Sequence, residues 1–273
     1  YGDHRDLHKE YRRQRQMCIR DRSTDLTKDR KVTIKSQTVS YTAGDDDLKG
    51  YIAFDDKSES ARPGVIVIHE WWGLDDYIRT RADRLAELGY TALAIDMYGN
   101  GATADSPDEA GGMMNAVLGN METGTSRLRA AHDVLCAQSV VDETRTAAIG
   151  YCFGGAMVLH MARIGMPLKA VVSFHGALGS FHTPRPGEIQ SRILICHGAK
   201  DNLVPESDIE TFNAEMATAE ANVKFESYEG ALHGFTNPEA TERGQSYGLP
   251  LAYDQRADEA SWSEMKALFN EVF

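Results

Sequence analysis

Cys152 is the residue of this sequence whose surroundings most clearly predict chemistry. It lies in GYCFGG (150–155), between a strand-like run (144–152) and a helix-like run (153–163). This is the nucleophile-elbow pattern G-x-S-x-G with cysteine in place of serine, in which small residues on either side allow a tight turn. The N-terminus of the following helix favours the thiolate, which is the reactive form of the side chain. The sequence therefore predicts a cysteine nucleophile; a buried cysteine in a glycine-rich turn is the alternative.

Asp201 and His233 are the two other groups that a nucleophilic cysteine needs. Asp201 follows the apolar run 192–198, and His233 lies in the loop after the last strand-like run, 223–229. An acid in this place can orient a histidine and stabilise its charged form. The chain order nucleophile, acid, histidine is that of the α/β-hydrolase triad, so we predict Cys152, Asp201 and His233 as the catalytic residues. His175 also follows a strand-like run, but it precedes the acid and is only a rival to His233.

The segment HEWWG (69–73) follows the first core strand-like run and contains further candidates. Attack on an ester carbonyl creates an oxyanion, which needs two N–H donors, one from this loop and one from the residue after the nucleophile. We predict the backbone N–H groups of Trp71 and Phe153 for this role. Glu70 is an acid in apolar surroundings, which can shift its pKa. A buried acid paired with an arginine is the alternative reading of Glu70.

The elements that must position these residues follow from the hydrophobic pattern. Strand-like and helix-like runs alternate from residue 64 to the end of the chain, which predicts a mostly parallel sheet with helices on both faces. Two runs before it, 32–41 and 48–54, predict an antiparallel hairpin. The segment 236–253 is expected to be irregular. Ligands bind beyond the carboxyl ends of the strands in such sheets, and the candidate residues stand at those ends.

The start of the chain differs in composition from the rest. Residues 1–25 have no apolar periodicity and many basic side chains, and we expect a disordered or non-native segment there. A basic arm that binds nucleic acid is the alternative. Residues 26–273 are expected to form one α/β-hydrolase domain.

Charge and cysteine content restrict the partners. The 273 residues have a formal net charge of -12, which argues against nucleic acid or an anionic membrane as partner. No apolar run approaches the ~20 residues that span a bilayer. The four cysteines include no CxxC pair, so neither a zinc site nor a dithiol motif is indicated. We expect no metal, no cofactor, a cytoplasmic location and a monomer or small homo-oligomer.

The chain resembles the dienelactone hydrolase family over roughly residues 33–272. The resemblance rests on five motifs: HEWWG (69–73), AIDMYG (94–99), GYCFGG (150–155), HGAKDNLVP (197–205) and GALHGF (230–235). It implies Cys152 as nucleophile, His233 as general base and Asp201 as the residue that orients the histidine. It also implies that Glu70 holds the resting thiol until substrate displaces it.

One feature departs from the family pattern. Family members bind the carboxylate of a dienelactone with two arginines, one of them four residues after the catalytic histidine. Here that position is Asn237, and no arginine occurs between Arg84 and Arg127, where the other is expected. Arg79 and Arg81 fall on a helix-like run and are expected to be solvated. The substrate pocket is expected to include Trp72, Tyr98, Tyr151, Phe235 and Asn237.

These observations predict a hydrolase that cleaves an ester or lactone through a thioester acyl-enzyme, with neutral substrates preferred over anionic ones. A carboxylesterase or thioesterase of broad specificity is the alternative among enzymes. An inactive binding protein on the same fold and a thiol redox protein are the alternatives from other classes.

Overall fold

A pair of long antiparallel strands, β1 (Ile34–Ala43) and β2 (Asp46–Asp55), precedes the core sheet. The computed structural model describes residues 33–57 and 60–273, so the predicted segment 1–25 lies outside the described residues. The predicted hairpin is confirmed. Its turn is shorter than the acidic stretch suggests, because Asp46 and Asp47 already pair with β1, and Gly44 makes the reversal at φ +61°.

The core sheet is mostly parallel, as predicted. Within the described residues it has eight strands in the order β1-β2-β4-β3-β5-β6-β7-β8, and β2 joins β4 antiparallel. Every residue of the two short central strands β4 and β6 is buried, since helices cover both faces of the sheet. The bounds of the six later strands are β3 (Arg62–Ile68), β4 (Thr91–Ile95), β5 (Val141–Tyr151), β6 (Ala170–Phe174), β7 (Arg192–Gly198) and β8 (Val223–Tyr228).

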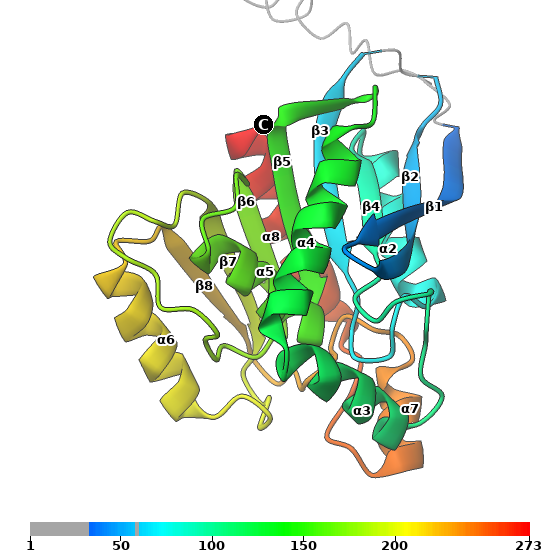
Figure 1. Cartoon of the computed structure of the whole chain (residues 1–273). Helices are drawn as coiled ribbons and strands as arrows, with labels where there is room; N and C mark the ends of the chain where they lie inside the picture. The colour runs from blue at the N-terminus through cyan, green and yellow to red at the C-terminus, as the bar shows by residue number, and fades with distance from the viewer. Residues whose placement is uncertain (1–32, 58–59) are drawn as a thin grey trace, which may run out of the picture. The chain divides into compact units, whose positions relative to one another are not determined.

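The helices form a layer on each face of this sheet (Figure 1). Alternation along β3 shows how one strand serves two cores: Ile66 and Ile68 belong to the core on the face covered by α4, α5 and α6, and Val65 and Val67 to the core on the face covered by α2 and α8. The five helices are α2 (Asp76–Glu87), α4 (Met121–Cys136), α5 (Phe153–Arg163), α6 (Glu206–Thr218) and α8 (Gln255–Val272). This arrangement confirms the α/β-hydrolase fold class.

Two helices, α3 (Pro107–Leu118) and α7 (Ala240–Tyr247), lie near the carboxyl ends of the parallel strands (Figure 1). The expectation of an irregular segment over 236–253 is wrong for α7. Its sequence ATERGQSY has no apolar stripe, and the helix instead packs through Gly244, where a side chain would clash with the carbonyl of Leu251. Periodicity could not reveal a helix that is held by backbone contact.

The neighbouring strands β3 and β5 mark the point where the chain changes direction across the sheet. From β3 the chain continues to β4 on one side, and from β5 it continues to β6 on the other. A crevice forms at such a switch point, and ligands bind there in open α/β sheets. The segment 69–73 and Cys152 follow these two strands directly, so the fold places both at the crevice. In the described ranges no helix combines the length and the apolar character that crossing a bilayer requires.

Candidate active site

Cys152 lies in a strained turn between β5 and α5. Its backbone has φ +53° and ψ -114°, a conformation that is uncommon for a residue with a side chain. The turn is tight because backbone meets backbone: a Cβ on Gly150 would clash with the carbonyl of Gly154, and a Cβ on Gly154 would clash with that of Ile68. The Cys152 N–H donates to the Phe174 carbonyl at 3.0 Å. As N-cap of α5, the residue has the positive end of the helix beside its sulfur.

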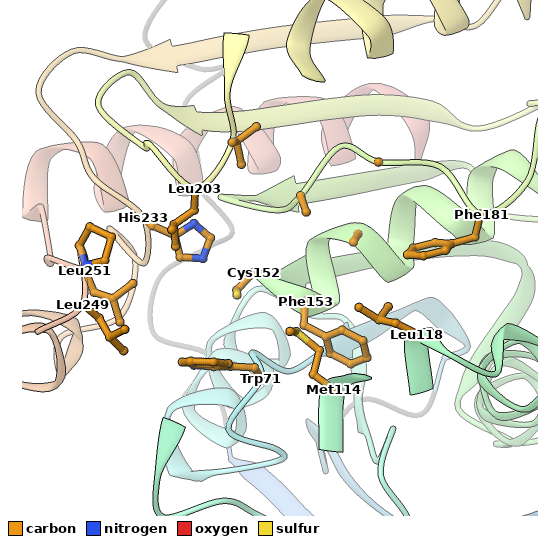
Figure 2. Close-up of a pocket in the computed structure, with 15 residues that line it drawn as sticks. Trp71, Met114, Leu118, Cys152, Phe153, Phe181, Leu203, His233, Leu249 and Leu251 are labelled. Carbon is orange, nitrogen blue, oxygen red and sulfur yellow. The ribbon is translucent and has the colours of Figure 1, made fainter. Parts of the chain in front are cut away.

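His233 connects Cys152 to Asp201. Its Nδ1 lies 2.7 Å from Asp201 Oδ2, and its ring faces the Cys152 sulfur, with which it interacts electrostatically. Burial lowers the pKa of His233, but the Cys152 sulfur and the bond to Asp201 outweigh it, so the pKa lies well above its ordinary value. Figure 2 shows the imidazole turned toward Cys152. The three residues predicted as a triad therefore lie together in the order that proton transfer requires.

Backbone contacts fix the loops that contain Asp201 and His233. The Leu203 N–H donates to Asp201 Oδ1 at 3.0 Å, which leaves Oδ2 for the histidine. The Ala252 N–H donates to the His233 carbonyl at 3.2 Å, and Leu251 forms a β-bridge with His233. The segment after α7 thus supports the histidine directly.

The two N–H groups predicted for an oxyanion hole belong to neighbouring segments. The Gly154 N–H donates to the His69 carbonyl at 3.0 Å, which ties the first turn of α5 to the loop after β3. The Tyr98 hydroxyl donates to the Trp71 carbonyl at 2.8 Å and orients that peptide. In the part of the chain that the structure describes, neither the Trp71 nor the Phe153 N–H donates to a protein acceptor. Both are available to a substrate oxygen, and their role stays a prediction.

Glu70 is buried, and its hydrogen-bond partner is Asn237. The Asn237 amide donates to Glu70 Oε2 at 2.6 Å. Burial raises the pKa of Glu70 to about 7, Asp75 adds to this rise, and the bond from Asn237 opposes it. Among the described residues the structure shows no hydrogen bond between Glu70 and Cys152, whose sulfur faces His233 instead. The predicted hold of Glu70 on the resting thiol stays a prediction, and Asn237 is a partner that the sequence did not suggest.

Polar residues that are mostly buried link the His233 loop (230–237), through its Thr236, to the elements behind it. We call them the support network: Tyr77, Arg81, His175, Thr236 and Asp258. Arg81 donates to the Thr236 carbonyl at 2.5 Å and to Asp258 at 2.7 Å. The Thr236 hydroxyl bonds the Tyr77 hydroxyl at 2.6 Å and His175 Nε2 at 2.7 Å. The expectation of a solvated Arg81 is wrong: its guanidinium lies 5.1 Å from the Tyr77 ring centre in the interior.

His175, the rival histidine, belongs to this network and has no contact with the nucleophile in the described structure. Burial lowers its pKa well below the ordinary value, and the neighbouring His233 and Arg81 lower it further. A neutral His175 packs edge to face against the His233 ring at 5.2 Å. Its place is behind the reacting groups.

A cavity of about 370 Å³ opens in front of Cys152 and His233 (Figure 2). Its walls are almost wholly apolar side chains that the sequence did not single out. The lining residues besides those two are Trp71, Met114, Leu118, Phe153, Ala156, Ala177, Gly179, Phe181, Leu203, Val204, Leu249, Pro250 and Leu251. The signals that could have revealed these residues are weak: Met114 and Leu118 in the second half of α3, and Leu-Pro-Leu in the segment 249–251.

None of the five residues predicted for the pocket lines this cavity, and each is engaged elsewhere. Tyr151 precedes the elbow on β5, so strand alternation points it to the α2–α8 face, where it stacks on Phe174. The other four are placed as follows: Trp72 beneath Arg243, Tyr98 in a separate groove along α3, Phe235 in the core beside His175, and Asn237 on Glu70. A position next to a motif in the sequence therefore does not establish that the side chain points into the cavity.

Comparison with known proteins agrees with these features. The model of the dienelactone hydrolase family matches residues 48–273. The chain belongs to this family. Protein usf of Aquifex pyrophilus is 28% identical over 240 residues, which cover 86% of this chain and 98% of that protein. The match confirms two predictions from the sequence: the family, and a hydrolase that acts on ester bonds.

Solved structures show the same fold. A dienelactone hydrolase-like promiscuous phosphotriesterase from metagenomic libraries superposes with a TM-score of 0.80 at 38% identity, covering 88% of this chain and 99% of its own. Esterase 2 of Thermogutta terrifontis superposes with a TM-score of 0.59 at 18% identity, over 87% of this chain and 94% of its own, which shows the fold alone. Within residues 33–57 and 60–273 no three His, Cys, Asp or Glu side chains gather as metal ligands.

Proposed function

We propose that this chain hydrolyses carboxylic esters or lactones through a thioester formed on Cys152. The observation that supports the proposal is the series Asp201–His233–Cys152, with 2.7 Å between His233 Nδ1 and Asp201 Oδ2 and the histidine ring turned toward the partly exposed sulfur. A histidine that Asp201 orients beside a sulfur at a helix N-terminus can take the thiol proton, which leaves the sulfur in its nucleophilic form.

In the first half of the reaction the Cys152 sulfur attacks the ester carbonyl. The new C–S bond moves negative charge to the carbonyl oxygen, where the N–H groups of Trp71 and Phe153 donate. Collapse of this intermediate breaks the C–O bond of the ester. The His233 imidazolium gives its proton to the departing oxygen, and Asp201 holds the ring in place.

In the second half water cleaves the thioester. His233 is now neutral and accepts a proton as water attacks the thioester carbonyl. The same N–H groups stabilise the second oxyanion. The carboxylic acid leaves, and the sulfur regains its partner in His233.

Trapping the thioester tests this mechanism. The chain is mixed with a p-nitrophenyl ester, quenched with acid and mapped by mass spectrometry; the acyl group is expected on Cys152. Cys136 is the matched control, because it is also partly exposed but lies on α4 away from His233. An acyl group on Cys136, or turnover that survives alkylation of Cys152, overturns the proposal.

Hydrolysis of neutral phosphotriesters is a second candidate. It is favoured by the likeness to a promiscuous phosphotriesterase at 38% identity and by a cavity that, in its described lining, holds no Lys or Arg. A neutral aryl phosphotriester should release its phenol in the presence of the chain but not of its Cys152→Ala variant. Equal release by both rules this candidate out.

A further inference from the structure

The cavity extends to two sides of Cys152 (Figure 2). On one side, Met114 and Leu118 of α3 pack with Phe153 on the same core, and Phe181 lies beyond them. The other side has Leu203, Leu249 and Leu251, and it also contains His233. Both sides are apolar, so the cavity has two hydrophobic subsites that meet at the sulfur.

Contacts of the backbone tie the second side to the triad. Leu251 forms a β-bridge with His233, and the Leu203 N–H donates to Asp201. The first side is tied to the nucleophile instead, because Phe153 follows Cys152 directly and the Ala156 N–H donates to the Cys152 carbonyl at 3.3 Å. The position of the histidine therefore makes the two subsites chemically different.

The direction of proton transfer assigns the subsites. In the proposed reaction His233 protonates the departing oxygen, so the alcohol part of the ester must lie on the His233 side. The acyl part stays on the sulfur and extends to the opposite side. On the basis of the proposed function, we infer that Met114, Leu118, Phe153 and Phe181 bind an apolar acyl group, that Leu203, Leu249 and Leu251 bind an apolar alcohol group, and that the substrate is a neutral ester.

The distribution of charge supports a neutral substrate. No Lys or Arg is among the described lining residues. Arg243, which comes from nearby α7, pairs with Asp75 at 3.4 Å and Glu239 at 2.6 Å. Asn237 is held by Glu70, which is itself an acid. A carboxylate in this cavity would have no Lys or Arg among the described lining residues to pair with, and burial of an unpaired charge is costly.

Two bulky substitutions separate the subsites. Leu118→Trp fills the acyl side and Leu249→Trp fills the alcohol side, and each is measured on two ester series: one with a growing acyl chain on one alcohol, one with a growing alcohol on one acyl group. Leu118→Trp should lower kcat/KM for the longest acyl chain about tenfold or more and leave the alcohol series unchanged, and Leu249→Trp should do the reverse. Met113→Ala is the control, because Met113 neighbours Met114 but lines a separate groove. Exchanged effects, or equal effects of each variant on both series, overturn the assignment.

Alkylation of Cys152 gives a second measurement that needs no turnover. Neutral N-alkyl iodoacetamides of growing length should label wild-type Cys152 faster than iodoacetate does, and Leu118→Trp or Leu249→Trp should slow the longest reagent most. If this preference appears but no ester is hydrolysed, the apolar subsites stand and the proposed function fails. Faster labelling by iodoacetate overturns the neutral substrate class, whatever the enzyme hydrolyses.

Discussion

The two sides of the His233 loop have opposite chemistry. In front of the loop lies the cavity, whose walls are leucine, methionine and aromatic side chains. Behind it lies the support network, with the buried Arg81–Asp258 pair and three hydrogen-bonded side chains. The support network is almost wholly buried, whereas the cavity opens to solvent at Phe181 and Leu203, which are 41% and 52% exposed. The difference teaches that the buried cation, Arg81, holds the His233 loop, whereas the described lining of the cavity contains no Lys or Arg.

Loss of the reacting groups in front of the loop should have the largest effect. Cys152→Ala or His233→Ala should lower kcat by on the order of 10³-fold or more, and Asp201→Asn should cost less. Because the residues act as a unit, the Cys152→Ala/His233→Ala double variant should be no slower than either single one. Steady-state kinetics on a p-nitrophenyl ester measure this. Additive losses would show that the cysteine and the histidine act separately.

The support network should act on stability first. Arg81→Met leaves Asp258 as an uncompensated buried charge, which should lower the free energy of unfolding by about 3–5 kcal/mol. Adding Asp258→Leu removes that charge and should restore part of the loss. Urea unfolding followed by circular dichroism measures both variants. A single variant as stable as wild type would mean that Arg81 does not support the loop.

Glu70 lies between the two regions and should give stability a pH dependence. Its carboxyl has a pKa of about 7 when folded against an ordinary value of 4.5, so the folded state binds more protons between these values. The free energy of unfolding should therefore fall as pH rises from 4.5 to 7, by about 3 kcal/mol. Glu70→Gln should remove this slope. Asn237→Leu should extend it to higher pH, because the bond from Asn237 lowers the pKa.

The smallest effect is expected from a single hydroxyl of the network. Tyr77→Phe removes the bond to Thr236 and should cost about 1 kcal/mol of stability. Activity should change little, since Arg81 still holds the Thr236 carbonyl. Tyr90→Phe is the control, because its exposure is intermediate and its ring packs on Phe269 and Phe273 away from the network. A large loss of kcat with unchanged stability would show that Tyr77 takes part in the reaction and does not merely support the loop.

Sequence reasoning located the candidate triad because its signals are local. Cys152 and Asp201 follow buried strands, which apolar runs identify even in a single sequence, and His233 follows a half-exposed strand of alternating pattern. The order of the motifs along the chain then restricted the fold. The fold class, the hairpin and the family could be predicted in this way.

The cavity walls could not be predicted, because they depend on where distant segments meet. Leu118, Phe181 and Leu251 come from separate segments, and nothing near them in sequence indicates a common space. Arg81 shows that the same limit applies to a buried polar residue. Its helix pattern suggested solvent, but Asp258 is 177 residues away, and only the fold brings the two together.

The close backbone contacts at the nucleophile elbow also limit which substitutions this site can accept during evolution. Gly150 and Gly154 touch neighbouring carbonyls where any side chain would clash, so these positions tolerate almost no replacement. The contacts of these two glycines, and not the side chain at position 152, determine the shape of the turn. A library that randomises residues 150–155 should therefore retain foldable members with serine, alanine or cysteine at 152 and almost none with a new residue at 150 or 154. The residue at position 152 can therefore be replaced without loss of the fold, whereas Gly150 and Gly154 cannot.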